Sequence, residues 1–530
     1  MNSNKKSCDN EDMHINTLDM SLQNVAQGTL LVIISTGIAL VLGFVSRIFL
    51  ARVFTQYDYG VYSLSIVIFS ILESISLLGL SSGTTRYIAY HREKNDQLKV
   101  KQIIFSSIQI SLITSIVISI SLFLLSDFLS QIFRDSALAF PLKIVAIAIP
   151  FTVMTDIFVA ISRGFNIVKE KVYFQDILKN AIFTLSLFMV VILKLSFEYA
   201  FYTFTISSFL TFIVYLVYLK DKSHIAIRDG GKIISSNDLR KEILFFSLPI
   251  LFIVIFQMIL SWTDTIMLGG YNTLNDVGLY NAAVPLASFI GIPLSAMLLI
   301  YMPTASAQYA RNLFTELARN YAILTKWVFS STLPLFLVFF IFPESVLNFF
   351  FGINYVPAGQ ALRILSFGYI ISNLLGPNGT TLIAIGETRF LMYVSVFAAV
   401  INILLNMLFI PQMGIVGASL ATAIALTIHC IIRHNKVRSK LKINPITKNL
   451  IKTTLITTIL TVSISIFLIK YVQVTFWMLP LLFIFFYLIH FFVILFSKSI
   501  EPEEVILFLE IEKKIGINLS PIKKLVRKFL

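Results

Sequence analysis

The stretch Val41 to Tyr62 decides the fold of this chain and reads V-L-G-F-V-S-R-I-F-L-A-R-V-F-T-Q-Y-D-Y-G-V-Y. It holds the outer half of one long apolar segment and the turn into the next. Arg47 lies inside the apolar run, where a charged side chain costs at least about 2.5–3.5 kcal/mol on membrane-insertion scales. The stretch therefore predicts a membrane-spanning helix with a cationic residue that needs a partner or a function.

The turn in this stretch occurs a second time. Thr55-Gln-Tyr-Asp-Tyr-Gly-Val-Tyr62 matches Thr273-Leu-Asn-Asp-Val-Gly-Leu-Tyr280, with the same Thr, Asp, Gly and Tyr 218 residues later. An Asp followed two residues later by Gly is typical of a turn between helices, so we interpret Asp58 as a turn residue. The repetition predicts a duplicated membrane bundle whose two copies insert the same way round, related by an axis along the membrane normal.

Composition supports a membrane protein throughout. The 530 residues are 57% hydrophobic and only 13% charged, with a mean hydropathy of +0.84, whereas soluble domains carry roughly 25% charged residues. Ten-residue alternating segments, the signature of a membrane β-barrel, are not found in the sequence. The predicted fold class is an all-α polytopic membrane protein.

Apolar segments long enough to span a bilayer recur along the chain, about 20 residues each. We count fourteen, near residues 25–52, 60–85, 103–126, 138–162, 173–193, 198–219, 243–269, 278–304, 322–343, 356–384, 390–410, 414–432, 450–470 and 474–497. With the repeat, they predict two six-helix lobes related by pseudo-two-fold symmetry plus two extra helices. The predicted divisions are a polar head at 1–24, an N-lobe at 25–219, a basic linker at 220–242, a C-lobe at 243–432, accessory spans at 433–497 and a tail at 498–530.

The basic residues predict the orientation. Of the 42 Lys and Arg residues, 34 lie in the head, the tail and the even-numbered linkers, and five lie in the alternate linkers. Because Lys and Arg concentrate in cytoplasmic loops, we expect a multi-pass protein of the cell membrane with both termini in the cytoplasm. The same distribution explains the net charge of +14 without nucleic acid, since no basic patch with interleaved aromatics stands apart from the spans.

Other chemistries lack their sequence signals. The two cysteines, Cys8 and Cys430, cannot form a disulfide framework or a metal cluster. Walker A and H-E-x-x-H patterns do not occur, so we expect no cofactor, no catalytic residues and no metal site. The head lacks the charged, apolar and small-residue pattern of a cleaved signal peptide. Short outer loops argue against a membrane glycosyltransferase, and the chain is not expected to be an enzyme.

Function must then be read from charged and polar residues within the spans, which are functional by default in this setting. In the first two spans, Arg47 shares a helix face with Gly43 and carries a planar fork suited to phosphate; alternatively it snorkels to the outer interface. Arg52 lies at that interface. Glu73 is too deep to snorkel, and Arg47 is its candidate partner, in a functional or a purely structural pair. Arg86 could meet a headgroup phosphate or serve as a topology residue.

The later spans carry further candidates. Asp264 in the seventh span aligns at the repeat offset with Ser46, beside Arg47, and we hypothesise an Asp264–Arg47 contact that closes the outer side in one state. Asp156 and the pair Asp176 and Lys179, spaced i, i+3, are expected to form a structural network. Substrate-binding or cavity candidates in the tenth span are Arg363 and Asn373, just before a Gly-Pro-Asn-Gly break at 376–379 that predicts a discontinuous helix lining a cavity.

Three blocks of the chain resemble a known group of transporters. The first is the span 1 arrangement from Arg47 through Tyr62, the second is W-T-D-T-I-M-L-G with V-G-L-Y-N-A-A (262–283), and the third is I-P-Q-M-G-I-V-G-A-S-L-A-T (410–422). Together they resemble the polysaccharide-biosynthesis flippases of the multidrug/oligosaccharidyl-lipid/polysaccharide exporter superfamily. The L-G-F-V-S-R segment is also similar to the first span of lipid II flippases, whose arginines in that region face the cavity, although the Arg position is shifted by one residue.

The resemblance implies alternating access around a central cavity. The expected function is to flip lipid-linked oligosaccharide or polysaccharide repeat units from the cytoplasmic to the outer face. The expected partners are a polyprenyl-phosphate-linked glycan, membrane lipids, a possible coupling ion (H⁺ or Na⁺) and glycosyltransferases of the same process. The main alternative is a cation-coupled multidrug or metabolite antiporter of the same superfamily, although the acidic residue that many of its members carry in span 1 is absent here.

Overall fold

The described part of the chain is helical, with no strand among the described residues. The structure, a computed structural model, describes residues 34–167, 169–221, 237–442, 445, 447–472, 476–497 and 499. The predicted head, most of the predicted linker and the tail from residue 500 onward lie outside these residues. Two compact units are found: the first holds residues up to Phe54 and Leu64–Ile255, and the second holds Thr55–Ser63 and Phe256 onward. The division between Ile255 and Phe256 falls inside the helix Asn237–Tyr271.

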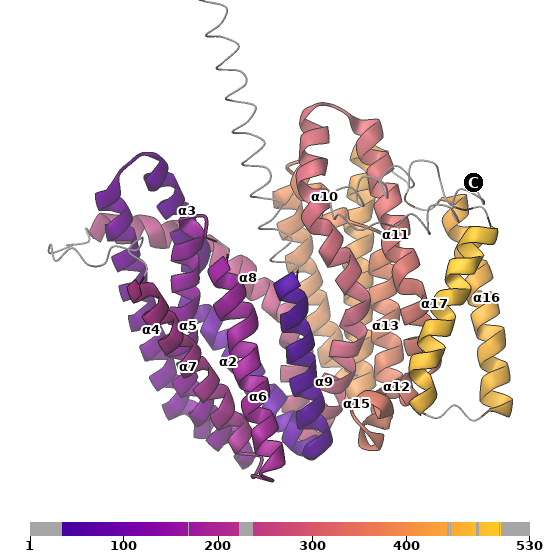
Figure 1. Ribbon diagram of the computed structural model, residues 1–530, viewed down its shortest axis with the longest axis horizontal. Helices are drawn as coiled ribbons and strands as arrows, with labels where there is room; N and C mark the ends of the chain where they lie inside the picture. Colours follow the sequence, from indigo (N-terminus) through magenta and orange to yellow (C-terminus); the bar gives the residue numbers. More distant parts are fainter. Residues whose placement is uncertain are drawn as a thin grey trace, which may run out of the picture. The chain divides into compact units, whose positions relative to one another are not determined.

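The helices of the first unit follow the predicted apolar segments (Figure 1). An initial helix spans Ile34–Val53. It is followed by α2 (Gln56–Leu77), α3 (Leu80–Glu93), α4 (Gln97–Ile132), η1 (Ser136–Leu138), α5 (Ala139–Gly164), the π-helix η2 (Lys171–Leu178), α6 (Lys179–Ile192), α7 (Tyr199–Asp221) and the first part of α8 (Asn237–Tyr271).

The second unit continues from α8 in the same manner. It comprises α9 (Leu274–Ser288), η3 (Phe289–Gly291), α10 (Ile292–Ala310), α11 (Phe314–Ile341), α12 (Pro343–Phe350), η4 (Ile353–Ala358), α13 (Gly359–Leu374), α14 (Asn378–Ala384), α15 (Thr388–Leu441), α16 (Lys448–Tyr471), η5 (Phe476–Met478) and α17 (Leu479–Phe496). In Figure 1, α16 and α17 form a hairpin, and both helices contact α11.

Twelve described helices are long and apolar enough to cross a membrane. The difference from fourteen predicted segments has a local explanation. The predicted segments at 390–410 and 414–432 are both helical, and together they make up α15 as two helical parts that meet at a sharp bend at Gly414, where the backbone is non-helical (φ 55°, ψ −128°). The tenth segment is divided into α13 and α14, as the Gly-Pro-Asn-Gly break predicts, with Gly376 in the left-handed region at φ 70°.

The surface of the first unit has the polarity expected in lipid. Helix α4, which packs against α3 and α5, buries six serines, whereas many of its large apolar side chains are exposed; the serines are Ser106, Ser107, Ser111, Ser115, Ser126 and Ser130. Leu124, for example, is 70% exposed. Small residues at a helix interface let backbones approach closely in a bilayer, where there is no hydrophobic drive to bury leucine. The arrangement supports an all-α polytopic membrane protein.

Candidate functional site

A buried carboxylate in the second unit collects the densest polar contacts of that unit. Asp264 on α8 is 4% exposed. The Tyr280 hydroxyl on α9 donates to its Oδ2 at 2.5 Å, and the Thr422 hydroxyl on α15 donates to the same oxygen. Its Oδ1 accepts from Asn406 Nδ2 at 2.6 Å and from Asn402 Nδ2 at 3.5 Å. These five residues form what we call the Asp264 cluster.

The Asp264 cluster holds its charge with neutral groups. All four of the described partners of Asp264 are hydroxyls or amides, so dipoles rather than a cation stabilise the carboxylate. Asn402 and Asn406 are four residues apart and therefore share one face of α15; both are buried, at 1% and 0% exposure. Asn406 Oδ1 is buried and has no hydrogen-bond partner among the described residues. An unused oxygen thus lies beside the carboxylate, and rotation of the amide would turn it toward Asp264.

These atoms can hold a proton or a small cation. Among the described residues, no group of three or more His, Cys, Asp or Glu side chains could bind a metal ion, so a multivalent transition-metal site is not built here. Carboxylate, amide and hydroxyl oxygens are instead ligands for hard cations. When its single carboxylate is ionised, the Asp264 cluster carries one negative charge, which one proton or one monovalent cation would neutralise.

The duplicated turn has the same structure in both copies. The Thr273 hydroxyl and the Asp276 carboxylate form a capping box at the start of α9. At the start of α2, the Thr55 hydroxyl and N–H both donate to Asp58 Oδ2, at 2.7 and 3.1 Å, and Asp58 N–H donates back to Thr55 Oγ1 at 3.1 Å. Each Thr and Asp therefore satisfies donors that an uncapped helix start leaves open. The prediction that Asp58 is a turn residue is confirmed.

The two glycines of the repeat meet within the second unit. A Cβ on Gly60 would lie 1.7 Å from the carbonyl oxygen of Leu274, and a Cβ on Gly278 would lie 2.2 Å from that of Gln56. Each glycine thus faces the residue four positions before the other. Tyr59, 1% exposed, donates to the carbonyl of Asn281 at 3.3 Å beside this contact. The repeat therefore forms a pseudo-symmetric crossing of α2 and α9 that has no room for a side chain.

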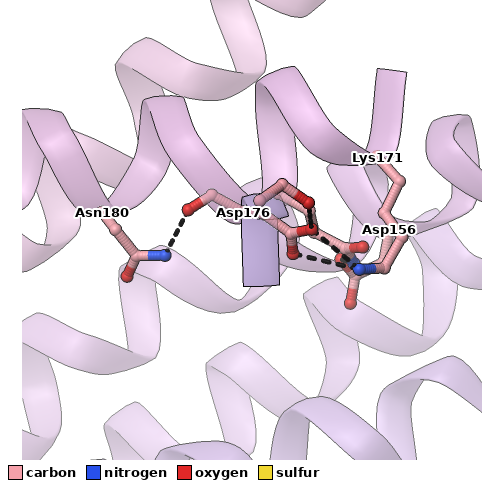
Figure 2. Close-up of polar contacts among 6 residues, drawn as sticks. Asp156, Lys171, Asp176 and Asn180 are labelled. Atoms are coloured by element: carbon pink, nitrogen blue, oxygen red, sulfur yellow. Dashed lines mark hydrogen bonds and ion pairs between the residues drawn. The ribbon is translucent and has the colours of Figure 1, made fainter. Parts of the chain in front are cut away.

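A second carboxylate network, half-buried, lies in the first unit (Figure 2). The Lys171 ammonium contacts both Asp176 oxygens, Oδ2 at 2.9 Å and Oδ1 at 3.1 Å. Ser35 of the first helix donates to Asp176 Oδ2 at 2.8 Å, and the Asn180 amide donates to the Asp176 backbone carbonyl at 2.8 Å. Beside them, Gln175 donates to Asp156 Oδ1. We call these six residues the Asp176 cluster.

The expected pair of Asp176 with Lys179 is wrong. Lys179 Nζ instead lies 5.7 Å from the centroid of the Phe204 ring, and Asp176 pairs with Lys171. The reason is the winding of the chain, because residues 171–178 form a π-helix. The i, i+3 rule applies to α-helices, whereas a π-helix has i→i+5 bonds and brings residues five apart onto one face.

Two of the predicted site residues of the first unit do not pair with each other. Arg47 is half-buried, and the described residues contain no Arg47–Glu73 ion pair. Glu73 instead lies within electrostatic range of Asp156, another carboxylate. Ser46, next to Arg47, contacts the Thr184 hydroxyl of α6 at 2.8 Å. Neighbouring residues are about 100° apart around a helix, so Arg47 does not share this face. The hypothetical Arg47–Asp264 contact joins different units and stays a prediction.

The remaining predicted residues are scattered. Arg52 is exposed, and the Arg86 guanidinium lies 4.2 Å from the Phe246 ring centroid. Arg363 Nε donates to the Phe340 carbonyl at the end of α11 at 2.8 Å and its Nη2 pairs with Glu344 at 3.4 Å. Asn373 is buried and donates to the Ile290 carbonyl at 2.7 Å. The contacts of Arg363 and Asn373 tie helices together, and neither residue joins the Asp264 cluster.

Sequence reasoning singled out Asp264 but missed most of its partners. Asn402, Asn406 and Thr422 lie in apolar segments 138 to 158 residues further along the chain. Two asparagines four residues apart within an apolar span are a usable signal, since buried amides need partners. Lys171 was counted among the cytoplasmic topology residues, and no local pattern marked it as a partner of Asp176.

The fold and these membrane-embedded polar clusters define an integral membrane transport protein with an internal duplication. A sequence model of the polysaccharide biosynthesis protein family matches residues 25–298, just over half of the chain, and the MatE family model matches residues 249–408. The chain belongs to the polysaccharide biosynthesis protein family, within the multidrug/oligosaccharidyl-lipid/polysaccharide exporter superfamily.

Known proteins agree with this membership. An uncharacterized membrane protein of Methanocaldococcus jannaschii is 22% identical over 74% of this chain and 79% of its own length. The probable low-salt glycan biosynthesis flippase Agl15 of Haloferax volcanii is 24% identical over 34% of this chain and 38% of its own. Among solved structures, the lipid II flippase MurJ in an inward closed conformation has a TM-score of 0.65 at 16% identity, covering 86% of this chain and 97% of that one. At this identity, MurJ supports the fold alone.

Proposed function

We propose that this protein flips polyprenyl-phosphate-linked oligosaccharide or polysaccharide units from the cytoplasmic to the outer face of the cell membrane. The observation that carries the proposal is the match to the polysaccharide biosynthesis family over residues 25–298. It is supported by the probable glycan biosynthesis flippase among the relatives and by a half-buried arginine, Arg47, in the first span. A guanidinium can bind a phosphate through two parallel hydrogen bonds.

In this proposal, the Asp264 cluster is the site that couples transport to the binding of a proton or cation. A buried anion held only by neutral donors changes its hydrogen bonds when a proton or cation arrives, because the same amides must then turn their oxygens to the ligand. The accepting carboxylate is on α8, and the donors come from α9 and α15. Ligand binding would therefore alter how these helices are tied together, and a ligand that favours one arrangement shifts the population toward it.

Deletion of the gene in its native host tests the substrate. We expect lipid-linked glycan to accumulate on the cytoplasmic face, measured by its protection from a membrane-impermeant glycan-modifying reagent in intact cells and its exposure after lysis. The wild-type gene should restore outward transfer, and the Asp264→Asn gene should not, although the protein is present in the membrane. An unchanged glycan distribution together with accumulation of drug would contradict the proposal.

A cation-coupled multidrug or metabolite antiporter is the second candidate. The match of the MatE family model to residues 249–408 favours it, and this region contains Asp264 and its α9 and α15 partners up to Asn406. Both candidates use the same coupling site. The deletion experiment separates them, because an antiporter alters drug sensitivity and leaves the glycan distribution unchanged.

A further inference from the structure

Lys171 occupies the place beside Asp176 that a bound cation would take. Its Nζ lies 2.9 and 3.1 Å from the two carboxylate oxygens, a two-oxygen contact that neutralises the charge directly. A third ligand-like contact to Asp176 comes from the Ser35 hydroxyl at 2.8 Å. The side chains are largely enclosed, with 26% of Lys171 and 13% of Asp176 exposed. Figure 2 shows the Lys171 nitrogen joined by dashed lines to the carboxylate oxygens of Asp176.

The π-winding of η2 is what brings the lysine there. Lys171 and Asp176 are five residues apart at either side of one π-turn. In an α-helix, with 3.6 residues per turn, five residues correspond to about 500°, which would leave the two side chains about 140° apart. The i→i+5 geometry of the π-helix places them on the same face. Asn180, by donating to the Asp176 carbonyl at 2.8 Å, gives this carbonyl a side-chain partner at the junction of η2 with α6.

Charged groups of both signs surround this pair. Asp156, next to Asp176 in the network, lies within electrostatic range of Glu73, Lys179 and Arg163. With Lys171 and Asp176, these residues are three carboxylates and three basic groups, and the buried Glu170 beside Lys171 accepts from the neutral Tyr215 hydroxyl. Loss of the Lys171 charge alone would leave one negative charge in excess, and an uncompensated buried charge is strongly destabilising. A monovalent cation or a proton would restore the balance.

We propose that Lys171 is a tethered counter-cation that fills a latent monovalent-cation site formed by Asp176 and Ser35, so that the first unit binds no free cation while the lysine is in place. The site would accept Na⁺ only when the ammonium is withdrawn or removed. Cation dependence of the intact protein would then come from the second unit. This inference does not depend on which substrate is carried, and it holds for a flippase or an antiporter.

The test is a Na⁺ titration of thermal unfolding with purified full-length protein in detergent, with choline chloride keeping the ionic strength constant. Lys171→Met keeps a side chain of similar length and removes the charge. We expect the Tm of this variant to gain a saturable rise with Na⁺. This rise should be absent when Asp176→Asn is added. By mass action, a ligand present at 100 times its Kd raises the ratio of folded to unfolded protein about 100-fold. In the otherwise wild-type protein, Asp176→Asn should leave the Na⁺ response unchanged.

Two controls make the outcome specific. Lys169→Met removes the same charge two residues earlier from an exposed position and should gain no Na⁺ response. Lys171→Arg keeps a tethered cation and should gain none either. The double variant Lys171→Met/Asp176→Asn is neutral at the pair, so it remains measurable if Lys171→Met alone is poorly folded. If Lys171→Met is poorly folded and added Na⁺ does not restore its folding, the proposal is overturned. A wild-type Na⁺ response that disappears in Asp176→Asn, or no Na⁺ gain in a folded Lys171→Met, also overturns it.

Discussion

Asp176 and Asp264 are both enclosed aspartates in membrane-embedded helices, one in each unit, and they are neutralised in different ways. Asp176 has an ammonium at 2.9 Å, whereas Asp264 has only hydroxyl and amide donors among its described partners. A carboxylate with a tethered cation has no charge to offer a passing ion. A carboxylate held only by dipoles has no fixed counter-charge, so its charge can be neutralised by a proton or a cation.

The duplicated turns show the opposite relation, because there the two copies are nearly alike. Each has a Thr–Asp capping box, and each glycine meets the backbone of the other copy. The two turns are therefore alike, whereas the two carboxylates have different partners. Substitutions at the glycine crossing test the feature that the copies share, and substitutions at the two carboxylates test how the two units differ.

The largest effect is expected at the glycine crossing. Gly60→Val and Gly278→Val should each lower the yield of folded protein severely, because a Cβ would lie 1.7 or 2.2 Å from a backbone oxygen and overpacking typically costs about 1–3 kcal/mol or more. Fluorescence-detected size-exclusion chromatography measures the folded fraction. Gly270→Val is the control, because a Cβ there meets no atom within 4 Å. Tolerance at Gly60 with intolerance at Gly278 would show that the two copies do not contribute equally.

Asp264→Asn should have the next largest effect, on transport rather than on folding. The amide keeps the size of the carboxylate but not its charge, so we expect outward transfer of glycan to fall by about tenfold or more, within the usual range of coupling free energies. Outward transfer is measured by glycan protection in cells that express equal amounts of protein. Asp176→Asn is the comparison and should leave the cation dependence of transport intact. Equal loss of cation dependence in both variants would remove the distinction between the two carboxylates.

Asn406→Leu should weaken cation binding in the second unit without abolishing folding. It removes the 2.6 Å donor to Asp264 and the buried, unpartnered Oδ1. Hydrogen bonds to charged groups contribute about 1.5–3 kcal/mol, so the cation concentration at half-maximal stabilisation should rise by about tenfold or more. Asn180→Leu in the first unit should leave this concentration unchanged. A Tm titration against Na⁺ and against pH measures both, and no shift in Asn406→Leu would remove this residue from the proposed site.

The smallest effect is expected from a surface ion pair. The hydrogen bond from Lys440, at 3.0 Å, is the main reason why the pKa of the Glu387 carboxyl is lowered, and Lys436 at 3.6 Å adds to it. A lowered pKa in the folded state means that stabilisation is present above the ordinary pKa of about 4.3 and is lost as the pH falls through the folded-state value. Glu387→Gln should therefore lower Tm slightly at pH 7, with no difference from wild type once Glu387 is protonated.

The response of the Glu387→Gln variant to salt provides a reference for the effects of substitutions at the buried carboxylate Asp264. High salt should reduce the effect of Glu387→Gln, because exposed charges are screened. The effects of Asp264→Asn should resist choline chloride, since its partners are buried. If salt removed both equally, Asp264 would behave as a surface charge and the proposed coupling site would be wrong.

Much of the fold could be predicted because its signals are local. The hydropathy of each segment marks a helix, and Thr55 with Asp58 marks the start of α2, since a capping box needs only residues three apart. The break at Gly376 and Pro377 was likewise predicted from the residues themselves. The bend inside α15 also lies at a predicted boundary, because Gly414, whose backbone angles are non-helical, is the residue at which the second of its two predicted spans begins.

The polar clusters mark the limit of such local signals. The sequence by itself determined a duplicated helical membrane protein, the turns that cap its helices and the presence of Asp264 within a span. Only the tertiary structure decided that Asp264 accepts a hydrogen bond from Asn406, 142 residues further along the chain. It also decided that Asp176, because of the π-winding, pairs with Lys171 and not with Lys179. Hydropathy and capping depend on neighbours in the chain, whereas the partner of a buried charge depends on helix winding and packing between distant segments.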